Sequence, residues 1–213
     1  MQSSEPMTAI HSNTIPRDEI TGLVLAGGRA QRMGGIDKGL IPLNGKPMVA
    51  HVIAALHSEI GNLLISANRN LEQYAAFGYP VVPDFMEGYL GPLAGMASGM
   101  QACGTQYIVT APCDSPLIAG DVVHRLCETA AREGADISVA HDGERMHPVF
   151  ALIRCNLLPD LLDFLNAGQR KIDRWYARHR LAVAYFCDQR EAFRNVNSPE
   201  ERAELEHEFE VTH

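Results

Sequence analysis

Residues 23–39, with the sequence LVLAGGRAQRMGGIDKG, set the expected fold of this chain. They continue a short apolar run over residues 20–26, which glycine ends. A short apolar run bounded by glycine predicts a buried β-strand followed by a loop. The loop holds several glycines together with the cations Arg29, Arg32 and Lys38.

This glycine-rich loop predicts a binding site for an anion, most simply a polyphosphate. Glycine lets backbone N–H groups approach a ligand closely, and successive N–H groups form anion-binding concavities. The Walker spacing and the G-x-G-x-x-G fingerprint are both absent, so neither of those phosphate motifs applies. The alternative is a flexible surface loop with solvated charges. Cations directly after a first strand favour the phosphate interpretation.

The composition limits the classes of function. The chain has 213 residues, and we expect a loose leader over residues 1–18 and a single domain over 19–213. A net charge of −8 argues against a general nucleic-acid binder. No signal-peptide pattern and no membrane-length apolar segment is apparent, so no membrane partner is expected. Five scattered cysteines without a C-x-x-C pair favour reduced thiols and a cytoplasmic location.

Predicted strands and helices alternate along most of the chain. Periodicity and turn signals predict strands over residues 20–26, 63–66, 80–84, 107–111, 137–140, 148–153 and 181–186. Helices are predicted over residues 48–60, 71–77, 92–102, 121–133, 156–165, 172–179 and 199–209, the last opened by the capping box SPEE at 198–201. This order predicts an α/β, three-layer, Rossmann-like fold with a mainly parallel sheet and helices on both faces.

Polar residues follow several of these strands. Asn68, Asp84 and Asp114 each come directly after a predicted strand, as does the glycine loop. In parallel sheets ligands bind beyond the carboxyl ends of the strands, so we expect these residues along one edge. Asp114 suits Mg²⁺, which takes one or two carboxylates plus substrate oxygens. The alternative is that Asp114 caps a turn before Ser115-Pro116. The residues alone do not favour one interpretation over the other.

The other candidate residues suit binding of phosphate or of a nucleotide base. Lys38 offers a point charge and Arg32 a planar fork for phosphate oxygens, and the alternative for both is solvent exposure. Asn68 and Asp84 offer hydrogen bonds to a base or ribose, although each is individually more typical of a loop. Asn195 and Asn197, before the last helix, either close the site or cap that helix.

Taken together, these motifs resemble a known family. The run LAGG at 25–28 followed by RMGGxDK at 32–38 resembles nucleotidyltransferases with the GT-A-like (nucleotide-diphospho-sugar transferase-like) fold. The fuller series is similar to the MobA family, the molybdenum cofactor guanylyltransferases. It adds LNGKP at 43–47, ANR at 67–69, GPLAG at 91–95, PCD at 112–114, HDGER at 141–145 with HP at 147–148, and NVNSPEE at 195–201.

The resemblance implies a reaction and its residues. GMP passes from GTP to the molybdenum-bound molybdopterin cofactor, pyrophosphate leaves, and Mg²⁺ is required. Carried over by position, the nucleotide contacts are Leu25, Ala26, Gly27, Gly28, Lys38, Asn68, Asp84 and Asp114. Arg32, Gly35, Lys38 and Asp114 are the implied catalytic residues, and Asp114 is also the implied metal ligand. Asn195 and Asn197 fall on the pterin side.

The resemblance also bears on partners and leaves alternatives open. Besides the two substrates, GTP and molybdopterin, it implies protein partners. These are proteins that deliver molybdopterin and proteins that take part in the maturation of molybdoenzymes. One alternative is a related cytidylyltransferase or a sugar-phosphate nucleotidyltransferase. Another is a non-catalytic nucleotide- and pterin-binding delivery module, which the presence of Lys38 and Asp114 disfavours.

Overall fold

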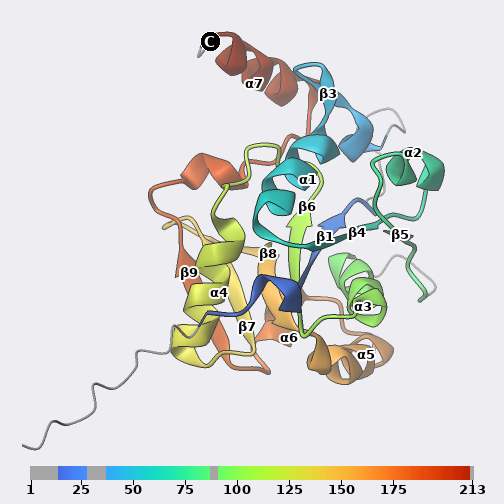
Figure 1. Ribbon diagram of the computed structural model, residues 1–213, viewed down its shortest axis with the longest axis vertical. Coiled ribbons are helices and arrows are strands. Elements are labelled where there is room, and N and C mark those ends of the chain that lie inside the picture. The colour runs from blue at the N-terminus through green and yellow to red at the C-terminus, as the bar shows by residue number, and fades with distance from the viewer. Residues whose placement is uncertain (1–13, 28–36, 87–90, 212–213) are drawn as a thin grey trace, which may run out of the picture.

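A central seven-stranded sheet organises the computed structural model, which describes residues 14–27, 37–86 and 91–211. The strand order is β5-β4-β1-β6-β8-β7-β9 (Figure 1). Only β8 runs antiparallel to its neighbours, so the prediction of a mainly parallel sheet is confirmed. The strands are β1 (Ile20–Leu25), β4 (Asn62–Ser66), β5 (Val81–Val82), β6 (Tyr107–Pro112), β7 (Ile137–His141), β8 (Met146–Arg154) and β9 (Leu181–Tyr185).

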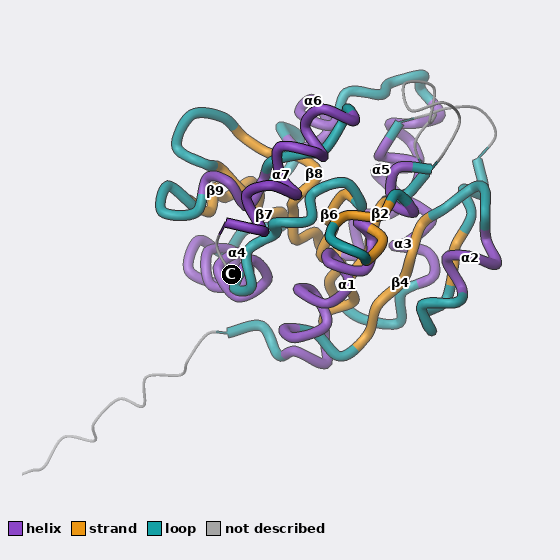
Figure 2. Tube along the Cα trace, turned by 90° about the horizontal axis from the view of Figure 1, so that it is seen from above, coloured by secondary structure: helices purple, strands orange, loops and turns teal. Residues whose placement is uncertain are grey.

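Helices cover both faces of this sheet, as predicted. Seen from above, α1 and α4 lie on one side of the strands, and α3 and α5 lie on the other (Figure 2). The α-helices are α1 (Met48–Glu59), α2 (Leu71–Ala75), α3 (Pro92–Ala102), α4 (Val122–Glu133), α5 (Leu158–Asn166), α6 (Ile172–Tyr176) and α7 (Pro199–Val211). Short 3₁₀ turns are η1 (Arg17–Glu19), η2 (Lys38–Leu40), η3 (Cys155–Leu157) and η4 (Arg190–Phe193).

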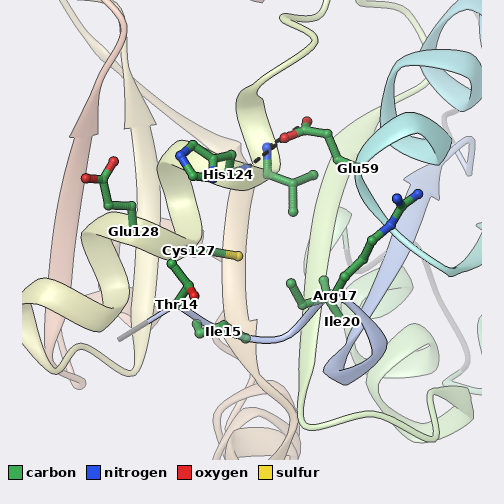
Figure 3. Close-up of a pocket in the computed structure, with 9 residues that line it drawn as sticks. Thr14, Ile15, Arg17, Ile20, Glu59, His124, Cys127 and Glu128 are labelled. Carbon is green, nitrogen blue, oxygen red and sulfur yellow. Dashed lines mark hydrogen bonds between the residues drawn. The ribbon is translucent and has the colours of Figure 1, made fainter. Parts of the chain in front are cut away.

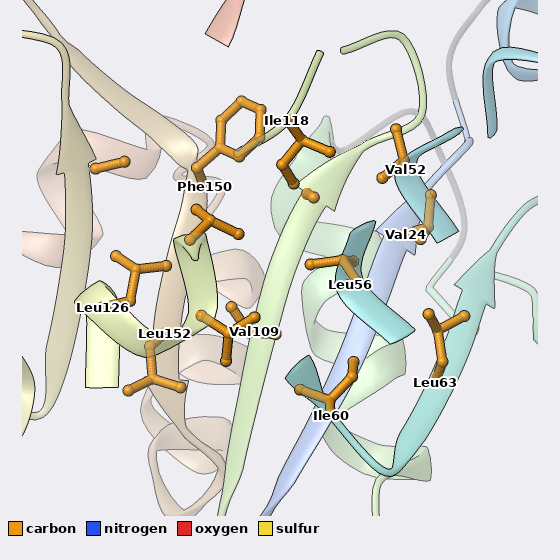
Figure 4. Close-up of a cluster of buried hydrophobic side chains, with 14 of the residues drawn as sticks. Val24, Val52, Leu56, Ile60, Leu63, Val109, Ile118, Leu126, Phe150 and Leu152 are labelled. Atoms are coloured by element: carbon orange, nitrogen blue, oxygen red, sulfur yellow. The ribbon is translucent and has the colours of Figure 1, made fainter. Parts of the chain in front are cut away.

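The two cores follow from the alternation of side chains along each strand. In β1, Val24 packs into the core under α1 and α4, whereas Leu23 packs into the core under α3 and α5. In β6, Val109 likewise packs into the first of these cores and Ile108 into the second. Figure 4 shows the first core between the helices and the sheet. Because successive side chains point to opposite faces, continuous apolar runs were the correct signal for these doubly covered strands.

The last helix begins as the sequence predicts. The backbone N–H of Glu201 donates to Ser198 Oγ (3.2 Å), and the N–H of Ser198 donates to Glu201 Oε2 (3.2 Å). This reciprocal pair is the capping box. Val196 and Leu205 then pack with Ile41, Leu43 and Met48 in a small third core, which holds α7 against the rest of the fold.

Two local features add detail to the expectations. The Asn44-Gly45 turn closes a two-stranded hairpin of β2 (Pro42–Leu43) and β3 (Lys46–Pro47), with positive φ angles of 48° and 75° that suit these two residue types. The second feature lies near the end of residues 1–18, the segment that we expect to be a leader. The Arg17 guanidinium donates to the carbonyl oxygens of His57 and Ile60 (2.8 Å each), where α1 leaves acceptors without helical partners. Residues 1–13 lie outside the described part.

None of the helices in the described ranges is both long enough and apolar enough to span a bilayer.

Candidate active site

Three adjacent strands end at the same level and bring their following residues to one edge. Leu25 pairs with Ser66 of β4 and with Pro112 of β6. Beyond these pairs, the Ala26 N–H donates to the Ser66 carbonyl (2.8 Å) and the Cys113 N–H donates to the Leu25 carbonyl (3.1 Å). The expected clustering at the carboxyl ends of the strands is therefore confirmed for the residues the structure describes.

Lys38, Asp114 and Asn197 form the centre of this edge. Lys38 Nζ donates to Asn197 Oδ1 (2.6 Å) and lies 3.2 Å from Asp114 Oδ2. The side chains of Lys38 and Asp114 are 25% and 14% exposed, so the ion pair is neither deeply buried nor fully hydrated. A cation in such a position can exchange a carboxylate partner for a phosphate oxygen when a nucleotide enters.

Asp37 supports the position of Lys38 and was not among the predicted site residues. Its side chain is 4% exposed, forms an ion pair with Arg69, and accepts a hydrogen bond from Asn70 Nδ2 (2.7 Å). On the other side of Lys38, a Cβ on Gly39 would lie 2.9 Å from Tyr74 Oη and 3.1 Å from Cys113 Sγ. Any other residue would therefore push η2 away from β6. The sequence showed Asp37 inside the motif but not its partner 32 positions away.

Asn68 and Asp84 hold each other at the neighbouring strand ends. Asn68 Nδ2 donates to Asp84 Oδ2 (2.8 Å), and the Asp84 N–H donates back to Asn68 Oδ1 (2.8 Å). A Cβ on Gly27 would lie 3.3 Å from Asn68 Nδ2, so the start of the glycine loop is adjacent to this pair. Asp84 Oδ1 is buried and accepts no hydrogen bond from any residue that the structure describes. A buried carboxylate oxygen of this kind requires a donor, which an N–H-bearing base edge can supply.

Asn195 and Asn197 flank a buried residue and point into the same region. Between them, Val196 is fully buried, and its N–H donates to the Asp114 carbonyl (2.8 Å). Asn195 Oδ1 accepts from Ser115 Oγ (2.7 Å), while Asn197 contacts Lys38. The backbone N–H groups of Asn197 and Ser198 also donate to the Glu201 carboxylate. The segment therefore takes part in capping the last helix, and the side chains of Asn195 and Asn197 contact Ser115 and Lys38.

A pocket of about 240 Å³ adjoins this segment. It lies between the end of β6 and the start of β8 and is lined by Pro112, Asn195, Arg145, Met146, His147, Pro148, Val149 and Phe150. His147 is held by Asp142 Oδ2 (2.6 Å) and stacks on Phe193 with ring centroids 4.7 Å apart. Burial acts to raise the pKa of Asp142, but the Arg145 N–H, the His147 side chain and the Glu144 N–H together lower it well below its ordinary value.

A second pocket, of about 270 Å³, lies near the start of β1 (Figure 3). Two of its charged side chains, Glu59 and Arg17, have structural partners. The Glu59 carboxylate accepts the N–H groups of Val123 (3.0 Å) and His124 (2.8 Å) at the start of α4, and Arg17 satisfies carbonyls at the end of α1. These contacts stabilise helix ends, so this pocket is not the candidate site.

Some predicted residues lie outside the described ranges. These are Gly28, Arg32 and Gly35, while Leu25, Ala26 and Gly27 form the end of β1 and the start of the loop.

For a metal, no group of three or more His, Cys, Asp or Glu side chains converges within the described ranges. Of the described residues, only Lys38 forms a hydrogen bond and ion pair with the Asp114 carboxylate, at Oδ2. A single carboxylate with a free oxygen suits Mg²⁺ shared with substrate phosphates.

Comparisons with known proteins define the class. The family model described as the MobA-like NTP transferase domain matches residues 22–183. The crystal structure of molybdopterin-guanine dinucleotide biosynthesis protein A from Archaeoglobus fulgidus superposes with a TM-score of 0.76, covering 90% of this chain and 99% of that chain at 20% identity. That similarity supports the fold. The fold and the family model together define a nucleotidyltransferase.

Curated relatives narrow the class to a family. The molybdenum cofactor guanylyltransferase of Shewanella sediminis (strain HAW-EB3) is 48% identical over 187 residues, which is 88% of this chain and 95% of that protein. The molybdenum cofactor guanylyltransferase of Cupriavidus pinatubonensis (strain JMP 134 / LMG 1197) is 50% identical over 192 residues, which is 88% of this chain and 96% of that protein. The chain belongs to the molybdenum cofactor guanylyltransferases of the MobA-like family.

Proposed function

We propose that this chain transfers GMP from GTP to the molybdenum-bound molybdopterin cofactor, forming the guanine dinucleotide cofactor and pyrophosphate. The observation that carries the proposal is the Lys38–Asp114–Asn197 cluster at the carboxyl edge of the sheet, in a chain about half identical to enzymes named for this activity. In α/β sheets of this type, ligands occupy that edge.

The nucleotide lies along the ends of β4, β1 and β6 in this proposal. The triphosphate follows the glycine loop, and Leu25, Ala26 and Gly27 line its start. Asn68 fixes the Asp84 carboxylate through two hydrogen bonds, which leaves Asp84 Oδ1 as the acceptor for N–H donors of the guanine. An acceptor-only group favours a base edge that presents donors.

The acceptor lies on the other side of Asp114. The pocket beside Asn195 opens there, and Arg145 brings a cation to its rim with a side chain that is 75% exposed. A cation at the rim attracts the anionic phosphate of molybdopterin. Asn195 and Asn197, placed by the buried Val196, orient that phosphate toward the nucleotide.

The chemistry is an in-line displacement at phosphorus. A terminal phosphate oxygen of molybdopterin forms a new bond to the α-phosphorus of GTP, while the bond from that phosphorus to the pyrophosphate breaks. The attacking phosphate is already anionic, so no strong general base is required. Catalysis then depends on alignment of the two substrates and on stabilisation of charge that develops on the oxygens.

Lys38 and Asp114 supply that stabilisation. The Lys38 ammonium, held ready by Asp114 and Asn197, moves to the phosphate oxygens as they enter, so the cation needs no large reorganisation. Asp114 is the residue that would hold Mg²⁺, which when bound neutralises phosphate charge and helps to align the reacting oxygens. We also infer a cytoplasmic location, because the five cysteines are odd in number and scattered along the chain, without a C-x-x-C pair.

A substrate panel tests the proposal. The purified protein is supplied with molybdenum-loaded molybdopterin, Mg²⁺ and each of GTP, CTP, ATP and UTP, and pyrophosphate release is measured. The proposal expects release with GTP that depends on both the pterin and Mg²⁺. Equal or greater release with CTP would assign a cytidylyltransferase, and pterin binding without release from any nucleotide would assign a delivery module.

A further inference from the structure

Two cysteines outside the candidate site lie close enough to react with each other. Cys103 Sγ and Cys155 Sγ are 2.8 Å apart, and both residues are half-buried rather than enclosed. The S–S bond of a disulfide is about 2.05 Å long, so closure requires an approach of less than about 1 Å. Of the other cysteines, Cys113 and Cys127 are buried, and Cys187 is exposed.

The backbone fixes the positions of both cysteines. Cys103 ends α3, and its N–H donates to the Gly99 carbonyl (2.8 Å). Cys155 begins η3 directly after β8, and its N–H donates to the Gln106 carbonyl (2.9 Å), just before β6. The pair therefore sits where β6 begins, at the end of that strand opposite Asp114.

The environment also makes one of the two thiols acidic. The hydrogen bond from Cys155 lowers the pKa of Cys103 to about 7, although burial opposes this shift. Burial instead raises the pKa of Cys127 to about 12 and raises the pKa of Cys113. Because the thiolate is the nucleophile in disulfide exchange, reactivity is expected at Cys103 before either of the buried thiols.

We propose that Cys103 and Cys155 form a reversible dithiol site that closes to a disulfide by exchange with low-molecular-weight disulfides. The Cys103 thiolate attacks one sulfur of the small disulfide, a mixed disulfide forms, and the first small thiolate leaves. The Cys155 sulfur, after losing its proton, then attacks Cys103 Sγ and expels the second small thiolate. The protein is oxidised by two electrons, and one small disulfide is reduced to two thiols.

Closure cross-links two segments that already pack together. Met100, near the end of α3, and Leu161, in α5, belong to the same core. A bond between Cys103 and Cys155 restrains the chain between them in the unfolded state and so stabilises the folded one. Because the pair lies at the far end of β6 from Asp114, the bond is expected to change stability rather than to block the candidate site.

The test uses the full chain and glutathione as the probe. Fully reduced protein is equilibrated with oxidised and reduced glutathione at varied ratios, quenched in acid, alkylated with N-ethylmaleimide and mapped by mass spectrometry. The expected result is a peptide pair linked through Cys103 and Cys155, which appears as the ratio of oxidised to reduced glutathione rises and disappears when the ratio is reversed. The melting temperature of the linked form should exceed that of the reduced form.

Matched variants separate this site from general thiol oxidation. Cys155→Ser should stop at a glutathione mixed disulfide on Cys103, whereas Cys187→Ser should form the cross-link as the parent chain does. The peptide map of the unaltered chain decides the question even if Cys155→Ser folds poorly. The proposal would be overturned by either of two results, each observed once Cys187 has been converted to its mixed disulfide. In the first, Cys103 and Cys155 are both still alkylated. In the second, each of them carries its own glutathione.

Discussion

The Lys38 ammonium joins Asp114 and Asn197, residues that are 76 and 159 positions away in the chain. Asp114 follows β6, and Asn197 directly precedes the capping box of α7. One side chain therefore connects the glycine loop, the centre of the sheet and the C-terminal segment. This connection places the cation that we propose to bind phosphate between the two proposed substrate positions.

The first prediction concerns this cation. Lys38→Ala should lower kcat/KM for GTP by about 10²- to 10³-fold, because the variant loses the ammonium group that stabilises the negative charge developing on the phosphate oxygens. Steady-state pyrophosphate release at varied GTP measures the effect. Lys46→Ala, which removes an exposed lysine in β3, is the matched control and should stay within about twofold of the parent. Equal losses in the two variants would show that Lys38 has no special role.

The second prediction concerns base selectivity. Asp84→Asn replaces an acceptor-only carboxylate with an amide that also donates, so the preference for GTP over other nucleotides should fall by about tenfold or more. The ratio of kcat/KM values for GTP and ATP measures it. A variant that lost activity equally with both nucleotides would remove Asp84 from base recognition.

The third prediction concerns the buried carboxylate beside Lys38. Asp37→Ala leaves Asn70 without its acceptor and Arg69 without its buried partner, so the free energy of unfolding should fall by about 1–3 kcal/mol. Urea denaturation measures this change. Asp163→Ala removes an exposed carboxylate and should cost less than about 0.5 kcal/mol. A loss for Asp37→Ala no larger than this control would contradict the supporting role.

The fourth prediction is a pH dependence. The pKa of Asp142 is lowered in the folded state, so its stabilising contribution is complete above its unfolded pKa of about 3.9 and is lost as pH falls from there toward the folded pKa. Asp142→Asn should therefore reduce the free energy of unfolding by about 1–3 kcal/mol at pH 7. The difference from the parent chain should shrink as the pH falls below about 4. Urea titrations across this range measure it, and a difference that does not change with pH would contradict the assignment.

The fifth prediction concerns the capping box. Glu201→Ala removes the acceptor for the N–H groups of Asn197 and Ser198, which should cost about 1 kcal/mol of stability. Because Asn197 contacts Lys38, turnover should also fall by a few-fold, and Glu201→Gln should restore part of both. Thermal melts and pyrophosphate release measure the two effects. If turnover is unchanged in Glu201→Ala, the capping box does not affect catalysis and this prediction is wrong.

Much of the fold could be predicted because its signals are local. The continuous apolar run before the glycine loop and the Ser198–Glu201 capping box both depend on neighbouring residues, and the sequence predicts each of them. Parallel strands then placed Asn68 and Asp114 at one edge. The contacts of Asp37 with Arg69, of Ser115 with Asn195 and of Arg17 with the end of α1 join distant segments. No spacing rule within one sequence reveals such contacts.

The fate of the α-phosphate of GTP tests the proposed transfer most directly. GTP labelled at that position is incubated with the protein, Mg²⁺ and molybdenum-loaded molybdopterin, and the label in the pterin fraction is compared with the pyrophosphate released. We predict one labelled GMP per pyrophosphate in the pterin product, and loss of nearly all transfer in Asp114→Ala but not in Lys46→Ala. Pyrophosphate release without label in the pterin, or undiminished transfer by Asp114→Ala, would contradict it.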